Sequence, residues 1–152
     1  MTTVAFPTLV QNIITALDGA TSLANVRIFD GIEIDESYPG DAIAVGHDGS
    51  EDGDLVAASI RNSYDQLGAK RMFEDGSINC SLWATSGNTN LTTLRVRAYE
   101  ILSAVDTVIR LDPSFSGACL YSGLEYHNPT YRQTNAGAAV IINFTIAYRA
   151  RT

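Results

Sequence analysis

Two cysteines and two histidines are the residues of this sequence that could bind a metal ion or form a nucleophilic pair. Cys80, Cys119, His47 and His127 lie far apart, without the short spacing typical of zinc sites. A zinc site or a Cys–His pair would therefore need a coincidence of folding. We expect the cysteines to be buried free thiols in separate strands, as suits a reducing cytoplasm. A disulfide would require those strands to be neighbours.

The acidic stretch of residues 48–54 resembles the first half of a calcium-binding loop. Asp48, Ser50 and Asp52 occupy positions one, three and five, and Gly53 occupies position six. Position twelve needs a bidentate Glu, but Ser59 stands there. We therefore interpret the stretch as an acidic Asp-Gly turn and expect no metal site, with calcium binding as the alternative.

The sequence contains no motif for catalysis or for phosphate binding. It lacks a Gly-x-Ser-x-Gly elbow, a glycine-rich phosphate loop and a His-Glu-x-x-His pair. The acidic neighbours Asp35-Glu36 and Glu74-Asp75 lie in turn-like regions, whereas acid–base catalysis needs carboxylates that converge in a cleft. We expect a protein that is not an enzyme, with no catalytic residue and no cofactor.

Length and charge limit the possible partners. The chain has 152 residues with 10 basic and 17 acidic side chains, a formal net charge of −7. This length favours a single domain over residues 1–152, and the acidic balance disfavours nucleic acid and anionic membranes as partners. Residues 1–20 contain no Lys or Arg, unlike a secretory signal, and no apolar stretch approaches the ~20 residues of a membrane span. We expect folding in a cytoplasm.

The charges are unevenly distributed along the chain. Nine of the 17 acidic residues lie between Asp30 and Asp54, a window without Lys or Arg. Every charged residue after Glu125 is basic. One interpretation is a solvated loop region and an ordinary basic tail. The other is that opposite charges meet between copies and guide a head-to-tail assembly, which salt would weaken.

Two amphipathic helices are expected, over about residues 7–18 and 89–110. Pro7 suits the start of the first helix and Gly19 its end. Asn88, Thr89 or Asn90 can cap the second, and Asp112-Pro113 stops it. The second helix has one apolar stripe formed by Leu91, Leu94, Ala98, Ile101, Leu102, Val105, Val108 and Ile109.

The other segments alternate with period two and predict strands. The clearest covers residues 138–148, with a partner over about 118–126 and a turn beginning at Asn128-Pro129. Glu74-Asp75-Gly76-Ser77 is the best hairpin turn, joining residues 69–73 to a strand over 77–85. Weaker runs cover 26–29, 42–47 and 55–64. We expect an α+β fold, a mostly antiparallel β-sheet with the long helix and the shorter N-terminal helix packed on one face.

The order of these segments resembles a known family. The similarity covers residues 5–151 and rests on the order of strand, turn and helix signals and on the ending Ala-Tyr-Arg-Ala-Arg. The matching segments are 26–31, 41–46, 67–71, 77–80, 83–87, 97–102, 121–123, a turn at Gln133, 137–138 and 144–151. They are similar to the tail terminator (tail completion) proteins of long-tailed bacteriophages, particularly those of actinobacteria.

The resemblance implies a structural virion protein at the head–tail junction, assembled in the host bacterial cytoplasm. Such proteins form hexameric rings that cap the tail tube, stop its polymerisation and offer the surface onto which the head docks. The implied partners are copies of itself, the tail tube protein and a head-completion or neck protein. DNA passes through the lumen without sequence-specific binding, and an acidic lumen would repel its phosphates.

The resemblance also suggests where contacts form. In members of this family, loops contact the tail tube and the neck. The corresponding positions in this chain would be residues 48–54 and the 68–76 hairpin. The expected interface residues, with the basic end of the chain, are Asp48, Glu51, Asp52, Asp54, Lys70, Arg71, Glu74, Asp75, Arg149 and Arg151.

Other functions remain open at this point. The chain could be another junction protein, such as a head–tail stopper or connector, or a tail tube subunit. A different class is a calcium- or ligand-binding module that uses the 48–54 loop. A hydrolase is the most distant alternative, since no nucleophile–base pair can be nominated.

Overall fold

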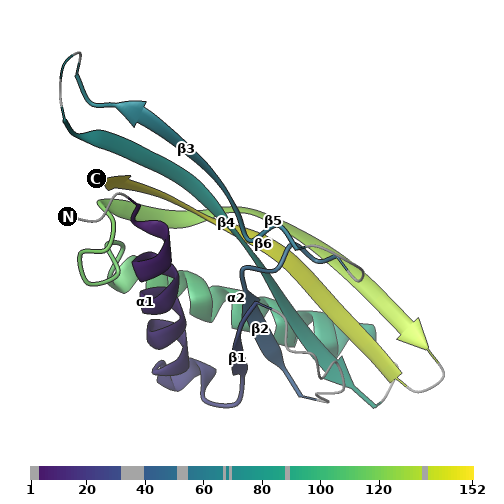
Figure 1. The fold of residues 1–152 in the computed structure, drawn as a ribbon. Helices are drawn as coiled ribbons and strands as arrows, with labels where there is room; N and C mark the ends of the chain where they lie inside the picture. The colour runs from purple at the N-terminus through teal and green to yellow at the C-terminus, as the bar shows by residue number, and fades with distance from the viewer. Residues whose placement is uncertain are drawn as a thin grey trace.

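The computed structural model describes residues 4–31, 40–50, 55–66, 68, 70–87, 90–134 and 137–152. Their order of elements is helix, four strands, long helix and two long strands (Figure 1), which follows the predicted order except that the strands expected at 69–73 and 77–85 are one strand. The elements are α1 (Phe6–Asp18), the 3₁₀ helix η1 (Thr21–Leu23), β1 (Arg27–Asp30), β2 (Ala42–Val45), β3 (Ala58–Tyr64), β4 (Met72–Ser86), α2 (Leu91–Leu111), β5 (Tyr121–Thr134) and β6 (Gly137–Arg151).

The strands form one six-stranded mixed sheet in the order β1-β2-β4-β6-β5, with β3 also paired to β4. Strands β2 and β3 share one edge of β4, because β2 pairs with residues 80–83 and β3 with residues 72–78. Every pair is antiparallel except β1 with β2. Both helices lie on one face of the sheet (Figure 1), which confirms the predicted α+β architecture.

The two helices follow their local signals closely. The side chain of Asn90 caps α2 by accepting a hydrogen bond from the Thr93 N–H at 3.3 Å, and the helix ends before Asp112. Pro7 lies in the first turn of α1. The buried residues facing the sheet are Leu9, Ile13 and Leu17 of α1 and Leu94, Ala98, Ile101, Leu102, Val105 and Ile109 of α2.

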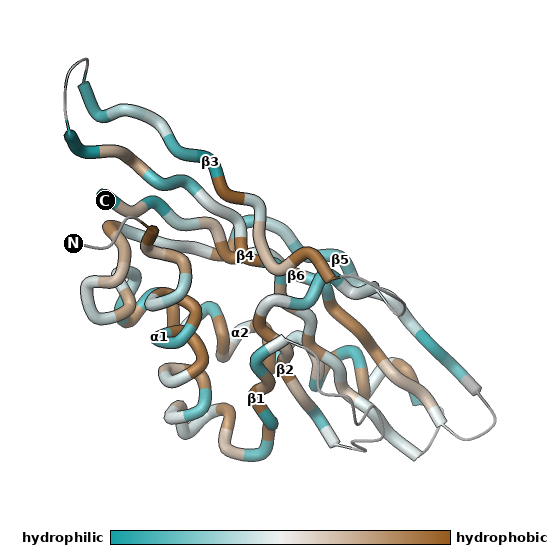
Figure 2. The backbone as a smooth tube through the Cα atoms, viewed as in Figure 1, coloured by the Kyte–Doolittle hydropathy of each residue, from teal (hydrophilic) through white to brown (hydrophobic). Residues whose placement is uncertain are grey.

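The helices cover the inner face of β4 and β6. Alternate residues of both strands are buried there, which confirms the period-two prediction. This core consists of Ile78, Cys80, Leu82 and Ala84 with Ala138, Val140, Ile142, Phe144, Ile146, Tyr148 and Ala150. Figure 2 shows that the ends of β3 and β4 that project past the helices are mostly hydrophilic.

The predicted hairpin turn at Glu74–Ser77 is wrong, because these residues lie inside β4. Gly76 is needed there for close packing, since an added Cβ would lie 2.4 Å from Cε1 of Tyr148. Pairing with β3 on one side and β6 on the other holds the segment extended. The turn between β3 and β4 lies instead between Tyr64 and Met72.

The predicted turn at Asn128-Pro129 is also wrong. Both residues lie inside β5, where Pro129 is opposite Ile142 of β6. Proline is tolerated because β5 is the last strand of the sheet, and the missing N–H can face the open edge. The β5–β6 connection lies between Thr134 and Gly137, and β5 begins at Tyr121, after Cys119.

Candidate interaction site on the open face of the sheet

A row of polar side chains crosses four strands on the face that the helices leave open. The register places Arg61 of β3 beside Asp75 of β4, Asp75 beside Arg149 of β6, and Arg149 beside Tyr121 of β5. Arg149 binds Asp75 with two hydrogen bonds, from Nε to Oδ1 at 2.6 Å and from Nη2 to Oδ2 at 3.0 Å. This bidentate pair, with a smaller effect of Arg61, lowers the pKa of Asp75.

The C-terminal arginines surround an aromatic ring beside this row. The guanidinium carbons of Arg149 and Arg151 lie 4.7 and 5.0 Å from the ring centroid of Phe73, close enough for cation–π contact. Arg151 also forms an ion pair with Asp65, with Nη2 and Oδ2 3.2 Å apart. The structure thus brings together three predicted residues, Asp75, Arg149 and Arg151, with Phe73 and Asp65, which the sequence analysis missed.

A shallow groove of about 680 Å³ runs beside the charged row. Its floor is low because the next row across the strands contains only small residues, which are Ser59, Ser77, Ala147 and Gly123. Glu125 borders the groove and accepts a hydrogen bond from the Ser77 hydroxyl to Oε2 at 2.8 Å. The groove carries both charge signs, so its chemistry suits a polar protein surface better than a purely anionic ligand.

Three predicted residues at the start of β4 lie in different environments. Lys70 and Arg71 are exposed in the turn before the strand. Glu74 is fully buried on the inner face, where Oε1 accepts from the Ala5 N–H at 3.1 Å and Oε2 from the Tyr148 hydroxyl at 2.6 Å. Burial, followed by this hydrogen bond, raises the pKa of Tyr148. Glu74 therefore anchors the N-terminal segment and has no exposed surface for a second chain.

Asp48 organises a loop elsewhere on the open face. Its carboxylate accepts from the N–H groups of Val56 at 3.0 Å and Ser50 at 2.9 Å, and these bonds lower its pKa. The loop lies over β6 at Asn143, since a Cβ on Gly49 would meet that side chain. Asn143 and Arg149 are about 20 Å apart along the strand, so the two predicted contact regions are separate. Glu51, Asp52 and Asp54 lie outside the described residues.

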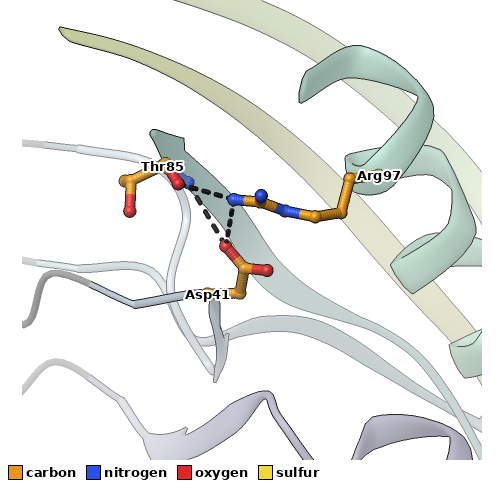
Figure 3. Close-up of polar contacts among 3 residues, drawn as sticks. All are labelled: Asp41, Thr85 and Arg97. Atoms are coloured by element: carbon orange, nitrogen blue, oxygen red, sulfur yellow. Dashed lines mark hydrogen bonds and ion pairs between the residues drawn. The ribbon is translucent and has the colours of Figure 1, made fainter. Parts of the chain in front are cut away.

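An ion pair that the sequence analysis did not foresee ties α2 to the sheet. Nη2 of Arg97 donates to Oδ1 of Asp41 at 2.9 Å and to the Thr85 carbonyl, and the Thr85 N–H donates to the same Asp41 oxygen at 3.3 Å (Figure 3). Asp41 belongs to the acidic window of residues 30–54, so part of that charge is balanced within the chain. Arg149 and Arg151 are likewise paired within the chain.

The cysteines and histidines do not converge on one site. Within the described ranges, no three His, Cys, Asp or Glu side chains are grouped to hold a metal ion. Cys80 and Cys119 are buried free thiols, as predicted, but the expected strand at Cys119 is wrong, because β5 begins at Tyr121. Burial raises the pKa values of the two thiols to about 12 and about 11. Nδ1 of His47 accepts from the Gly49 N–H at 2.8 Å, burial lowers the pKa of His47, and His127 packs edge-on against Tyr99.

Comparison with known proteins adds no relative. A scan against protein-family models finds no match to this sequence, and a search of the curated proteins finds none either. Among the described helices, none combines the length and the apolar character needed to cross a membrane.

Proposed function

We propose that this chain is a structural subunit of a bacteriophage virion, of the tail terminator type. In this proposal six copies of the chain, the number that the resemblance implies, form a ring at the end of the tail tube. The ring stops the tube from lengthening and gives the head its docking surface. Its partners are the tube protein and a neck protein, and no residue has a catalytic role.

The observation that supports this proposal is the agreement between the fold and the one that the resemblance implies. The N-terminal helix, the long α2 and the two long final strands β5 and β6 follow the expected order, and both helices cover one face of a mostly antiparallel sheet. The opposite face carries paired charges and a groove of protein-contact character at Asp75, Arg149 and Glu125.

Deletion of the gene from the phage genome that encodes it tests the proposal. We expect abnormally long tails without heads in electron micrographs of the lysate, with normal tails restored when the chain is supplied from a plasmid. Tails of normal length that lack heads would instead indicate a stopper or connector. An absence of tails, with purified chain that polymerises into tubes, would indicate a tube subunit. Infectious particles that lack the chain would refute a role in the virion.

A further inference from the structure

The sheet has an open edge on each side, and both edges expose large side chains. In the described part of the chain, β3 pairs only with β4, and β5 pairs only with β6. On β3, Ile60 and Tyr64 are 40% and 74% exposed, and on β5, Tyr121 and Tyr126 are 56% and 58% exposed. Exposed edge strands pair readily with another strand, and exposed tyrosines are enriched at protein interfaces.

The phase of the ladders shows which backbone groups face outward. Hydrogen bonds from the Asn79 N–H to the Ala57 carbonyl and from the Asp65 N–H to the Arg71 carbonyl direct the odd-numbered residues of β3 toward β4. Antiparallel ladders alternate, so the N–H and C=O groups of residues 58, 60, 62 and 64 face the open edge. On β5 the outward position Pro129 offers no N–H, and the register shift between Leu124 and Tyr126 puts a bulge in the stretch before it, which a partner strand would have to follow.

The strand directions make the two edges compatible with each other. β3 is antiparallel to β4, β4 to β6, and β6 to β5, so β3 and β5 run in opposite directions. A second copy placed beside the first, with the same face outward, would therefore continue the antiparallel sheet. We propose that the edge of β3, residues 58–64, pairs with the edge of β5, residues 121–128, of a second copy of this chain.

The charges of the two edges favour this pairing over pairing of like edges. Arg61 is the one charged residue of β3, and Glu125 is the one acidic residue of β5. Both are exposed and border the groove on the open face, so they come to the same face of the joined sheet. Pairing β3 with β3 would instead bring two arginines together. Because the contact joins different surfaces, it repeats from copy to copy and can close into a ring.

This inference rests on the self-association in the proposed function, and one substitution tests it directly. Asn62→Pro removes an outward N–H of β3 without removing a hydrogen bond to β4, and Asn62→Ala at the same position keeps that N–H. We expect light scattering to show that the wild-type chain and Asn62→Ala assemble, alone or with tail tubes, and that Asn62→Pro stays monomeric. Circular dichroism and thermal unfolding must show that all three chains are folded.

Crosslinking identifies the paired edges. Two singly substituted chains, Asn62→Cys and His127→Cys, are treated with a short thiol crosslinker. The native thiols are buried with raised pKa values and should not react. We expect a crosslinked dimer only when the two chains are mixed. A crosslinked dimer of Asn62→Cys alone would indicate that β3 pairs with β3 of a second copy, and it would overturn the proposal. Crosslinks that form only with a different protein, and never between copies of this chain, would overturn it as well.

The outcomes separate this inference from the proposed function. Assembly that Asn62→Pro leaves unchanged would refute the edge pairing and leave the ring intact. The edges could pair as described while a phage that lacks this chain still makes tails of normal length with heads. That result would refute the terminator function and leave the pairing intact. A chain that stays monomeric both alone and on tail tubes would refute the pairing.

Discussion

The two faces of the sheet differ in what holds them together. On the inner face, the ring of Tyr148 lies against Gly76 and its hydroxyl binds the buried Glu74. On the outer face, one neighbouring row has a solvent-facing ion pair, Asp75 with Arg149, and the other has open space above Gly123. Burial makes the inner contacts decisive for stability, whereas solvent screens the outer pair. The inner face therefore carries the contacts that stabilise the fold, and the proposed recognition surface lies on the opposite face of the same strands.

The largest expected difference between the faces comes from two adjacent isoleucines of β6. Ile142→Ala, on the inner face, should destabilise the fold by about 2–5 kcal/mol, because it leaves a cavity in a fully buried site. Ile141→Ala, on the half-buried outer face, should cost about 1 kcal/mol or less. Urea unfolding of both variants measures this, and equal losses would contradict the division between the faces.

A second test compares two tyrosines. Tyr148→Phe should cost about 1.5–3 kcal/mol, because it removes a buried hydrogen bond to the Glu74 carboxylate. Tyr121→Phe, at an exposed position on the other face, should leave the unfolding free energy nearly unchanged. If Tyr148→Phe unfolds at the wild-type urea concentration, the buried network does not stabilise the start of β4.

Two glycines, one on each face of the sheet, provide a third test of the difference between the faces. Gly76→Ala should destabilise the chain by about 1–3 kcal/mol, because its Cβ would overlap the Tyr148 ring. Gly123→Ala should be neutral or slightly stabilising, since nothing lies within 4 Å of the added Cβ. Thermal unfolding of the pair gives the difference, and a tolerated Gly76→Ala would show that the ring moves aside easily.

The smallest expected effect concerns pH on the outer face. The pKa of Asp75 is lowered in the folded chain, so its stabilising effect is present above the unfolded pKa and disappears as pH falls through the folded pKa. Asp75→Asn should therefore flatten the fall in stability in the acidic range, and Arg149→Gln should do the same. Unfolding curves between pH 2 and 6 for both variants and the double variant provide the check, and wild-type pH dependence in Asp75→Asn would exclude the effect.

The parts of the fold that depend on local signals could be predicted from the sequence. The apolar stripe and the Asn90 cap define α2 within a few neighbouring residues, and the alternation of residues 138–148 defines β6. Local signals could not show that the turn predicted at Gly76 is wrong. Its Asp-Gly signal is local, whereas the Tyr148 ring that requires the glycine comes from 72 positions later, 148 minus 76. Tertiary packing overrode the turn propensity.

The candidate site depended even more on contacts between distant segments. Asp75 and Arg149 were predicted separately, but only the register of β4 and β6 makes them partners. The Asp41–Arg97 pair joins residues 56 positions apart, and no spacing rule indicates it. The groove needs the register of four strands at once, because its floor is one small residue from each.

The proposed function requires that this chain ends a tail tube by adding to it as a ring, and electron microscopy of purified chain mixed with growing tubes can test this requirement. We expect one ring at one end of each tube and no further lengthening after the chain is added. Tubes that continue to lengthen with bare ends, in the presence of excess folded chain, would contradict it.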